Sequence, residues 1–230
     1  MVQVNPPYHN VRVKFRKVGD LQYISHLDLV RTMQKALKRA GLKMWYTEGF
    51  NPKPKMVFGP PLSIGVESEC EFLDIRLLDE PDFDGIKAKL DSVLPMELGV
   101  IEVFSPKAAL SDIAWLSYDM TVKSEETPDC VIGKLREFFA REEITVTKKS
   151  KKGDLTVNIR PLIKSVSFDL IDGGAKINCL LSSSSESFLN PEHLMRAIRD
   201  NTEIFKGNLI KESYTVLRKD AYLSDMTEFR

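Results

Sequence analysis

Val-Arg-Val-Lys-Phe at residues 11–15 alternates apolar and basic side chains, the pattern of a strand with one buried and one exposed face. A helical pattern begins after Ser25 and ends at Gly41. Ser25 is its expected N-cap, and Asp28 completes a variant of the capping box. Two strands, a helix and a fourth strand then complete a β-α-β-β-α-β order, at residues 56–58, 71–77, 83–94 and 99–104.

The second half of the chain repeats this order without obvious similarity in sequence. A helix is expected after Pro191, with Asn190 as its cap. Before it come a strand at residues 116–123, a helix at 130–140, and a hairpin of residues 144–148 and 155–159 across a basic turn at 148–153. Two paired strands follow the hairpin at residues 166–171 and 176–181, and a last strand follows the helix at 214–218. We therefore predict an α+β fold of two tandem ferredoxin-like sandwiches, residues 1–110 and 111–230. The alternative is one larger mixed sheet.

The composition is that of a globular protein. The chain has 230 residues, of which 43% are hydrophobic. No stretch approaches the roughly 20 apolar residues of a membrane span, and the polar N-terminus lacks the apolar core of a signal peptide. We expect a cytoplasmic protein that does not contact a membrane.

The cysteines and the usual enzyme signatures give no positive sign of a cofactor. Cys70, Cys130 and Cys179 are far apart in the sequence, which argues against a zinc ribbon or an iron–sulfur cluster held by this chain alone. We expect them to be buried free thiols. No phosphate-binding glycine loop, nucleophile elbow or His-Glu-x-x-His helix occurs. The sequence therefore predicts no metal and no cofactor.

Charge is distributed unevenly along a chain that is neutral overall. Residues 1–60 carry eleven basic and three acidic side chains, whereas residues 61–105 carry three basic and eleven acidic ones. Such asymmetry indicates interaction surfaces. On the first helix an apolar stripe is expected to face the core and the cations to face solvent: Val30, Met33, Leu37 and Ala40 against Arg31, Lys35, Lys38 and Arg39.

The run Gly-Phe-Asn-Pro-Lys-Pro-Lys at residues 49–55 cannot form a regular element, because each proline removes a donor and restricts the residue before it. We expect a stiff loop on which Lys53 and Lys55 point the same way. His26, in the first helical turn, can act as a general base, bind an anion or hold the cap in place. It is the one candidate for catalysis, and we predict no catalytic residue.

Two long motifs carry a family resemblance. The first is Phe-Arg-Lys-x-Gly-Asp-Leu-x-Tyr-Ile-Ser-His-Leu-Asp at residues 15–28, continued by Arg31 and by Ala-Leu-Lys-Arg-Ala-Gly-Leu at residues 36–42. The second is Tyr46-x-x-Gly-Phe-Asn-Pro-x-Pro-Lys, which ends at Lys55. This pattern resembles the radical SAM-linked protein family, a bacterial domain of unknown function fused to, or encoded beside, a radical SAM protein.

The resemblance implies a radical SAM protein as partner, and genes for ribosomal proteins and a ribonuclease as frequent neighbours. It is dense over residues 12–77 and sparse later in the chain. Two positions depart from the pattern: Lys53 stands where a histidine is usual, and Asn190 where an arginine is usual. The first departure leaves the loop a cationic role and removes a second candidate for acid–base chemistry.

From these observations we predict an accessory RNA-binding protein that acts on tRNA, rRNA or a ribosomal particle. It would present its substrate to a radical SAM partner. The residues expected to contact phosphates are Arg16, Lys17, Arg31, Lys35, Arg39, Lys53 and Lys55. Those expected to line an adjoining pocket are Tyr23, His26, Phe50 and Asn51. The alternatives are a metal-independent endoribonuclease of the tandem ferredoxin-like type, and a scaffold that binds only protein.

Overall fold

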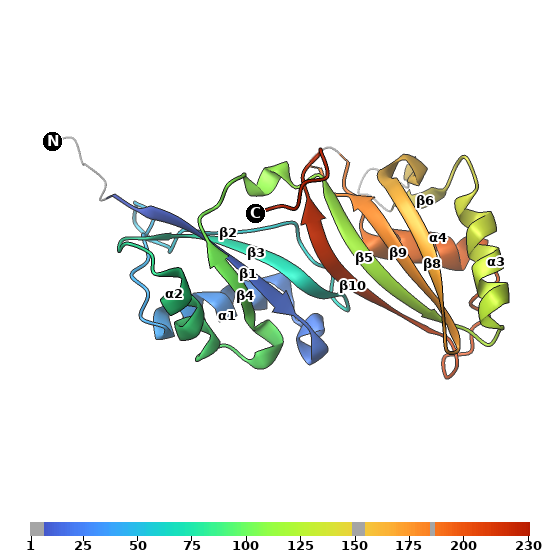
Figure 1. The fold of residues 1–230 in the computed structure, drawn as a ribbon, viewed down its shortest axis with the longest axis horizontal. Helices are drawn as coiled ribbons and strands as arrows, with labels where there is room; N and C mark the ends of the chain where they lie inside the picture. Colours follow the sequence, from blue (N-terminus) through green and yellow to red (C-terminus); the bar gives the residue numbers. More distant parts are fainter. Residues whose placement is uncertain (1–6, 149–154, 185–186) are drawn as a thin grey trace. The chain divides into compact units, whose positions relative to one another are not determined.

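The computed structural model describes residues 7–148, 155–184 and 187–230. These residues form two compact units: the first ends at Leu110 and includes Arg230, and the second spans Ser111–Phe229 (Figure 1). Each unit contains an antiparallel sheet and α-helices, which confirms the predicted α+β class. Within the described part of the chain, no helix is long and apolar enough to cross a membrane.

The first unit has the sheet order β4-β1-β3-β2, with every neighbouring pair antiparallel. Buried side chains of its strands and of both its helices form one cluster, which includes Val13, Phe15, Leu37, Ile75 and Ile86. Its helices and strands are β1 (His9–Lys17), α1 (His26–Arg39), β2 (Met56–Phe58), β3 (Glu67–Leu77), α2 (Phe83–Asp91) and β4 (Val100–Phe104), with short 3-10 helices η1 (Gly19–Tyr23) and η2 (Met96–Leu98).

Helix α1 begins where the sequence predicts. The Ser25 Oγ accepts a hydrogen bond from the backbone N–H of Asp28 at 3.1 Å and caps the first turn. The helix stops after the C-cap Ala40, where Gly41 takes a φ of 69° that few other residues tolerate. Its buried stripe is Leu29, Met33, Ala36 and Leu37. The predicted stripe is thus shifted, because Val30 and Ala40 are only half-buried.

Alternate side chains of β1 lie on opposite faces of the sheet, and the two faces have different environments. Val11, Val13 and Phe15 enter the helical side of the sheet, and Arg12 lies on the other face with its side chain fully buried. Two guanidinium nitrogens of Arg12 donate to the Asp74 carboxylate at 2.6 and 2.7 Å, and Nη2 also donates to the Ala108 carbonyl at 2.9 Å. Arg12 is therefore a structural cation, since a paired and hydrogen-bonded charge can be buried where a lone one cannot.

The second unit has the sheet order β10-β5-β9-β8, again antiparallel, with β6 and β7 paired separately. Strands β5 and β9 approach so closely that a Cβ at Gly174 would lie 1.9 Å from the Val122 carbonyl oxygen. The predicted basic turn falls largely outside the described residues. The elements are β5 (Trp115–Lys123), α3 (Pro128–Phe139), β6 (Thr145–Lys148), β7 (Leu155–Asn158), β8 (Ile163–Ile171), β9 (Gly174–Ser182), α4 (Pro191–Asn201) and β10 (Ser213–Tyr222).

The cysteines are free, as expected, but not uniformly buried. Cys70 and Cys179 are buried, and Cys130 is exposed on α3. Burial, with a smaller contribution from Asp119, raises the pKa of the Cys179 thiol. Among the described residues, no group of three or more His, Cys, Asp or Glu side chains is placed to hold a metal ion.

Candidate functional site

The outward face of α1 is a strip of cations. Its four members lie opposite the buried stripe and are all exposed: Arg31, Lys35, Lys38 and Arg39. Arg39 lies eight positions after Arg31, which at about 1.5 Å per residue makes the strip about 12 Å long. One member has an ion partner on the helix, because Arg31 lies 3.5 Å from the Asp28 carboxylate with both side chains mostly exposed. We call these four residues the cation strip.

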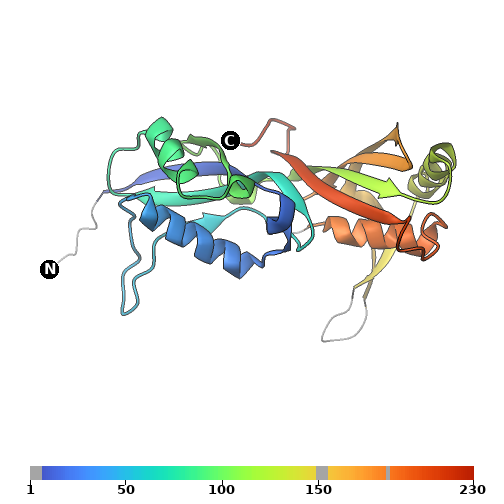
Figure 2. The same cartoon turned by 90° about the horizontal axis from the view of Figure 1, so that it is seen from below.

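Residues 45–55, which we call the arm, project from the first unit as a paired double strand rather than an irregular loop (Figure 2). Tyr46 and Pro54 form a β-bridge, and the Lys55 backbone N–H donates to the Trp45 carbonyl at 3.0 Å. Phe50, at the turn of the arm, is fully exposed, and Gly49 before it has a φ of 119°. The arm therefore presents an aromatic ring to solvent on a hydrogen-bonded support.

Aromatic stacking fixes the base of the arm to β3. The Arg76 guanidinium lies 4.2 Å from the ring centroid of Tyr8 and 5.4 Å from that of Trp45. The Trp45 backbone N–H donates to the Arg76 carbonyl at 2.8 Å. Stacked cation–π contacts of this kind contribute about 0.5–2 kcal/mol each. The arm is thus anchored at one end and exposed at the other.

The cation strip and the arm meet at the C-terminal end of α1. Met44 bridges Leu77, at the end of β3, and Met56 pairs with Ile75 as the chain returns from the arm. Arg39 is the last residue of α1, five positions before Met44. The strip therefore ends close in the chain to the arm, on which Asn51 and Lys53 are also exposed.

Tyr23 and His26 are separated by the length of α1 from the arm that carries Phe50 and Asn51, so the structure does not bring the four expected pocket residues together. Tyr23 and His26 lie at the N-terminal end of α1, and the 14 residues of the helix span about 20 Å. Their end of the unit is the one where β1 and β3 pair near Phe15 and Glu71. The sequence places the two motifs close together, but a whole helix separates them in space.

A small pocket opens at the N-terminal end of α1. The His26 ring meets the Phe58 ring edge-on, with centroids 5.3 Å apart. Lys17 and Glu71, both buried, line the same pocket from β1 and β3. Glu71 was missed as a pocket residue, although its place opposite Phe15 in the β1–β3 register brings it close to Lys17. Apolar walls with few polar groups are typical of ligand sites.

Two predicted phosphate contacts are not free surface cations. Lys17 is 2% exposed and donates from Nζ to the Gln22 carbonyl at 3.0 Å. It continues the buried alternation of Val13 and Phe15, which is the signal that sequence reasoning overlooked. Arg16 is half-buried and donates from Nε to the Met96 carbonyl at 2.9 Å. Lys55 is also half-buried, whereas Lys53 is exposed.

Part of the acidic segment pairs with the basic segment inside the first unit. Arg12 pairs with Asp74, and Lys43 Nζ lies 3.1 Å from an Asp79 carboxylate oxygen. The positive charge of residues 1–60 is therefore partly neutralised within the fold. What remains exposed is concentrated on the cation strip and the arm.

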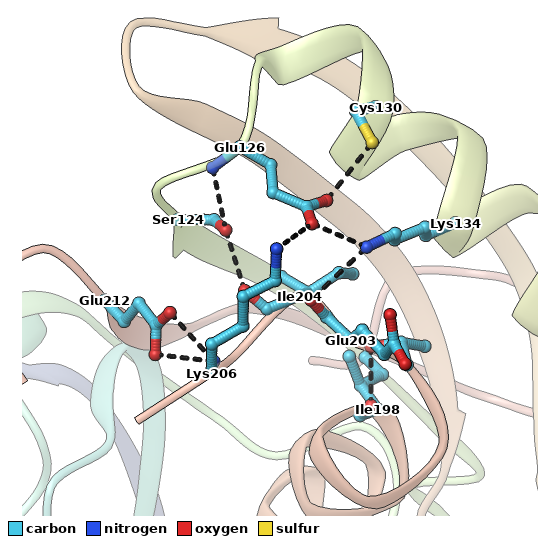
Figure 3. A network of polar contacts seen from close by, with 10 residues as sticks. Ser124, Glu126, Cys130, Lys134, Ile198, Glu203, Ile204, Lys206 and Glu212 are labelled. Carbon is cyan, nitrogen blue, oxygen red and sulfur yellow. Dashed lines mark hydrogen bonds and ion pairs between the residues drawn. The ribbon is translucent and has the colours of Figure 1, made fainter. Parts of the chain in front are cut away.

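The second unit has its own polar cluster, between α3 and the segment after α4 (Figure 3). Glu126 Oε1 lies 2.7 Å from both Lys134 Nζ and Lys206 Nζ, and Oε2 accepts from the Cys130 thiol at 3.1 Å. Hydrogen bonds from the two ammonium groups and the thiol hold the pKa of Glu126 at about 2. The same contact with Glu126 raises the pKa of Cys130. The cluster therefore links α3 to the segment after α4 and disfavours the thiolate form of Cys130.

Comparison with known proteins identifies the family. Residues 10–191 match the bacterial family DUF2344, described as an uncharacterised protein conserved in bacteria, and the chain belongs to it. No curated protein is significantly similar to the chain. The crystal structure of an unknown protein from Galdieria sulphuraria aligns over 92% of this chain and 99% of its own, with 11% identity and a TM-score of 0.30. No conclusion about fold or function follows from a likeness this weak.

Proposed function

We propose that the protein binds single-stranded RNA along the cation strip and the arm. The observation that carries this proposal is the presence of four exposed cations on one helix face and of a fully exposed Phe50 on the arm that follows the same helix. Cations contact phosphates, and an exposed aromatic ring stacks on an unpaired base.

The rigidity of the arm supports this proposal. Its backbone is already paired before any ligand arrives, so little ordering entropy is lost on binding. Base stacking on an aromatic side chain contributes about 1–3 kcal/mol per base, whereas the bases of a duplex are not free to stack on protein. The phosphate contacts under this proposal are Arg31, Lys35, Lys38, Arg39 and Lys53, and the base contacts are Phe50 and Asn51.

The wider setting is also part of the proposal. The resemblance of residues 15–28 and 46–55 to the radical SAM-linked family supports a radical SAM enzyme as partner, with tRNA, rRNA or a ribosomal particle as substrate, in the cytoplasm. We further propose that each unit is a ferredoxin-like sandwich. The strand orders β4-β1-β3-β2 and β10-β5-β9-β8, each with a helix after its first and third sheet strands, support this assignment.

A titration of a fluorescent single-stranded RNA, followed by anisotropy, tests the function. We expect Lys35→Ala with Arg39→Ala to weaken binding, and Phe50→Ala to weaken it by the roughly 1–3 kcal/mol of one stacked base. Lys89→Ala with Lys107→Ala is the matched control for charge, and Leu209→Ala for an exposed apolar side chain, because all three control residues are exposed and lie outside the site. Equal affinities of both test variants and their controls would remove the proposal.

A second candidate, metal-independent RNA cleavage, has one observation in its favour. His26, Lys17 and Glu71 line one pocket at the start of α1, so that groups able to move protons lie near one another. The resemblance supplies no established activity, and the cation strip runs away from this pocket. We therefore keep binding as the main proposal and test cleavage separately below.

A further inference from the structure

Exposed apolar side chains also gather at the other end of α1, away from the arm. Tyr23, Leu27 and Ile64 are 64%, 56% and 60% exposed. The Gly65 backbone N–H donates to the Gln22 carbonyl at 3.0 Å, which holds the turn carrying Ile64 against the segment carrying Tyr23. Leu27 follows in the first turn of α1. We call Tyr23, Leu27 and Ile64 the Tyr23 patch.

Carboxylates surround the Tyr23 patch. Glu67 accepts from the Gly19 backbone N–H at 2.6 Å, and the Glu97 carbonyl accepts from the Val18 N–H at 3.1 Å, so both residues lie beside η1. Two nearby cations add little positive charge: Lys17 is buried, and Arg31 lies 3.5 Å from the Asp28 carboxylate, so these two exposed charges offset each other. The acidic rim of the patch consists of Asp20, Glu67 and Glu97.

This charge decides what can cover the patch. Nucleic acid and an anionic membrane surface would both be repelled by the three rim carboxylates. A symmetric dimer through this patch would place the same carboxylates opposite one another, because the surface of a two-fold interface faces itself. A protein segment with apolar side chains flanked by Lys or Arg has the complementary pattern.

The pocket of His26 adjoins the Tyr23 patch. Ser25 and His26, which line the pocket, lie between Tyr23 and Leu27 in the chain. The remaining walls are mainly apolar and come from Ile24, Leu29, Phe58, Pro60, Pro61 and Leu62. The pocket has room for about one water molecule, so a partner would contact mainly the patch itself, where apolar contacts exclude water.

We propose that the Tyr23 patch and its acidic rim are the docking surface for a basic, apolar segment of a partner protein. The patch borders the cation strip, because Leu27 and Arg31 lie one turn apart on α1, but the two surfaces share no residue, so the inference stands whether or not the protein binds RNA. An occupied patch would leave Lys35, Lys38, Arg39 and the arm free, which allows one unit to hold a partner and a nucleic acid on different parts of α1.

Photocrosslinking identifies what covers the patch. The crosslinker p-benzoylphenylalanine replaces Leu27 in cells of the source bacterium, with the same replacement at Leu170 as control, since that residue is 58% exposed in the second unit. We expect a protein adduct from the Leu27 position only, with a crosslinked segment rich in Lys or Arg and containing apolar residues. An adduct with RNA, an adduct only with another copy of the chain, or no adduct would overturn the proposal.

Binding of a synthetic peptide with the sequence of the crosslinked segment then measures the contributions of the apolar side chains and of the rim carboxylates separately. We expect Leu27→Ser with Ile64→Ser to weaken peptide binding at least tenfold, because the apolar contacts are lost. We expect Asp20→Asn with Glu97→Gln to weaken it and to flatten its salt dependence. Ile101→Ser, at an exposed residue of β4, is the control. Unchanged affinity in both patch variants, with thermal midpoints that confirm folding, would contradict the assignment.

Discussion

Thr47 and Lys53 close the arm through two hydrogen bonds in opposite directions. The Thr47 backbone N–H donates to the Lys53 carbonyl at 2.8 Å, and the Lys53 backbone N–H donates to the Thr47 hydroxyl at 3.1 Å. Five residues lie between them, with Phe50 in the middle. The Thr47 hydroxyl thus helps to hold the two sides of the arm together below the Phe50 ring, which we propose stacks on a base.

Thr47→Val removes the acceptor for the Lys53 N–H while keeping the shape of the side chain. We expect faster amide hydrogen exchange at Lys53 and a severalfold weaker affinity for single-stranded RNA, because a looser arm must be ordered on binding. Thr47→Ser keeps the hydroxyl and serves as control. Exchange at Lys53 as slow in Thr47→Val as in the parent would show that the hydroxyl does not hold the arm.

Ser25→Ala tests the start of α1. The Ser25 Oγ accepts from the Asp28 N–H and donates to the Asp28 carboxylate at 2.7 Å. Loss of such a cap destabilises by about 0.5–2 kcal/mol. We expect a lower denaturant midpoint with an unchanged slope, and a smaller effect for Ser25→Asp, which retains a capping oxygen. A midpoint equal to that of the parent would contradict this cap.

Glu126 predicts a pH dependence of stability. Its pKa is about 2 in the folded protein and near 4.5 without its partners, so its contribution is complete above about pH 4.5 and is lost as the pH falls toward 2. We expect Glu126→Gln to lower the free energy of unfolding at pH 7 and the difference from the parent to shrink below pH 4.5. Glu137→Gln, at an exposed carboxylate of α3, is the control. A difference independent of pH would contradict the proposed cause.

His26 separates binding from cleavage. We expect the purified protein to show no metal-independent turnover of RNA and His26→Ala to leave RNA affinity nearly unchanged, because His26 lies a helix length from the arm. A general base would contribute about 10²–10⁴-fold to cleavage. Chelator-resistant product formation that disappears in His26→Ala, with binding to a 2′-deoxy substrate intact, would replace the main proposal with a nuclease.

Local signals explain how much of the fold the sequence predicts. The strand at residues 56–58, the caps Ser25 and Asn190, and the ends of α1 depend on neighbouring residues and agree with the structure. Strand β3 begins four residues earlier than expected, at Glu67, because charged residues there alternate with buried Ser68 and Cys70. Helix α3 likewise starts at Pro128, which suits a first helical turn.

The candidate site is harder to predict, because it depends on distance in space. Charge counting treats Arg12 and Lys17 as surface cations, but the register of β1 with β3 buries both, with Arg12 opposite Asp74. Nearness in sequence suggests that His26 and Phe50 share a pocket, whereas α1 holds them apart. The periodicity of α1, which sets cations opposite apolar residues, and the proline-rich run at residues 49–55 both predict exposed side chains correctly.

The salt dependence of RNA affinity tests the central claim most directly. For a single strand, log Kobs falls against log salt with a slope of about −0.7 per phosphate contact. We predict measurable binding with a negative slope, and a slope shallower by about 1.4 in Lys35→Ala with Arg39→Ala, while Lys89→Ala with Lys107→Ala keeps the parent slope. A parent protein that does not bind, or a strip variant with the same slope as the control, would contradict the account.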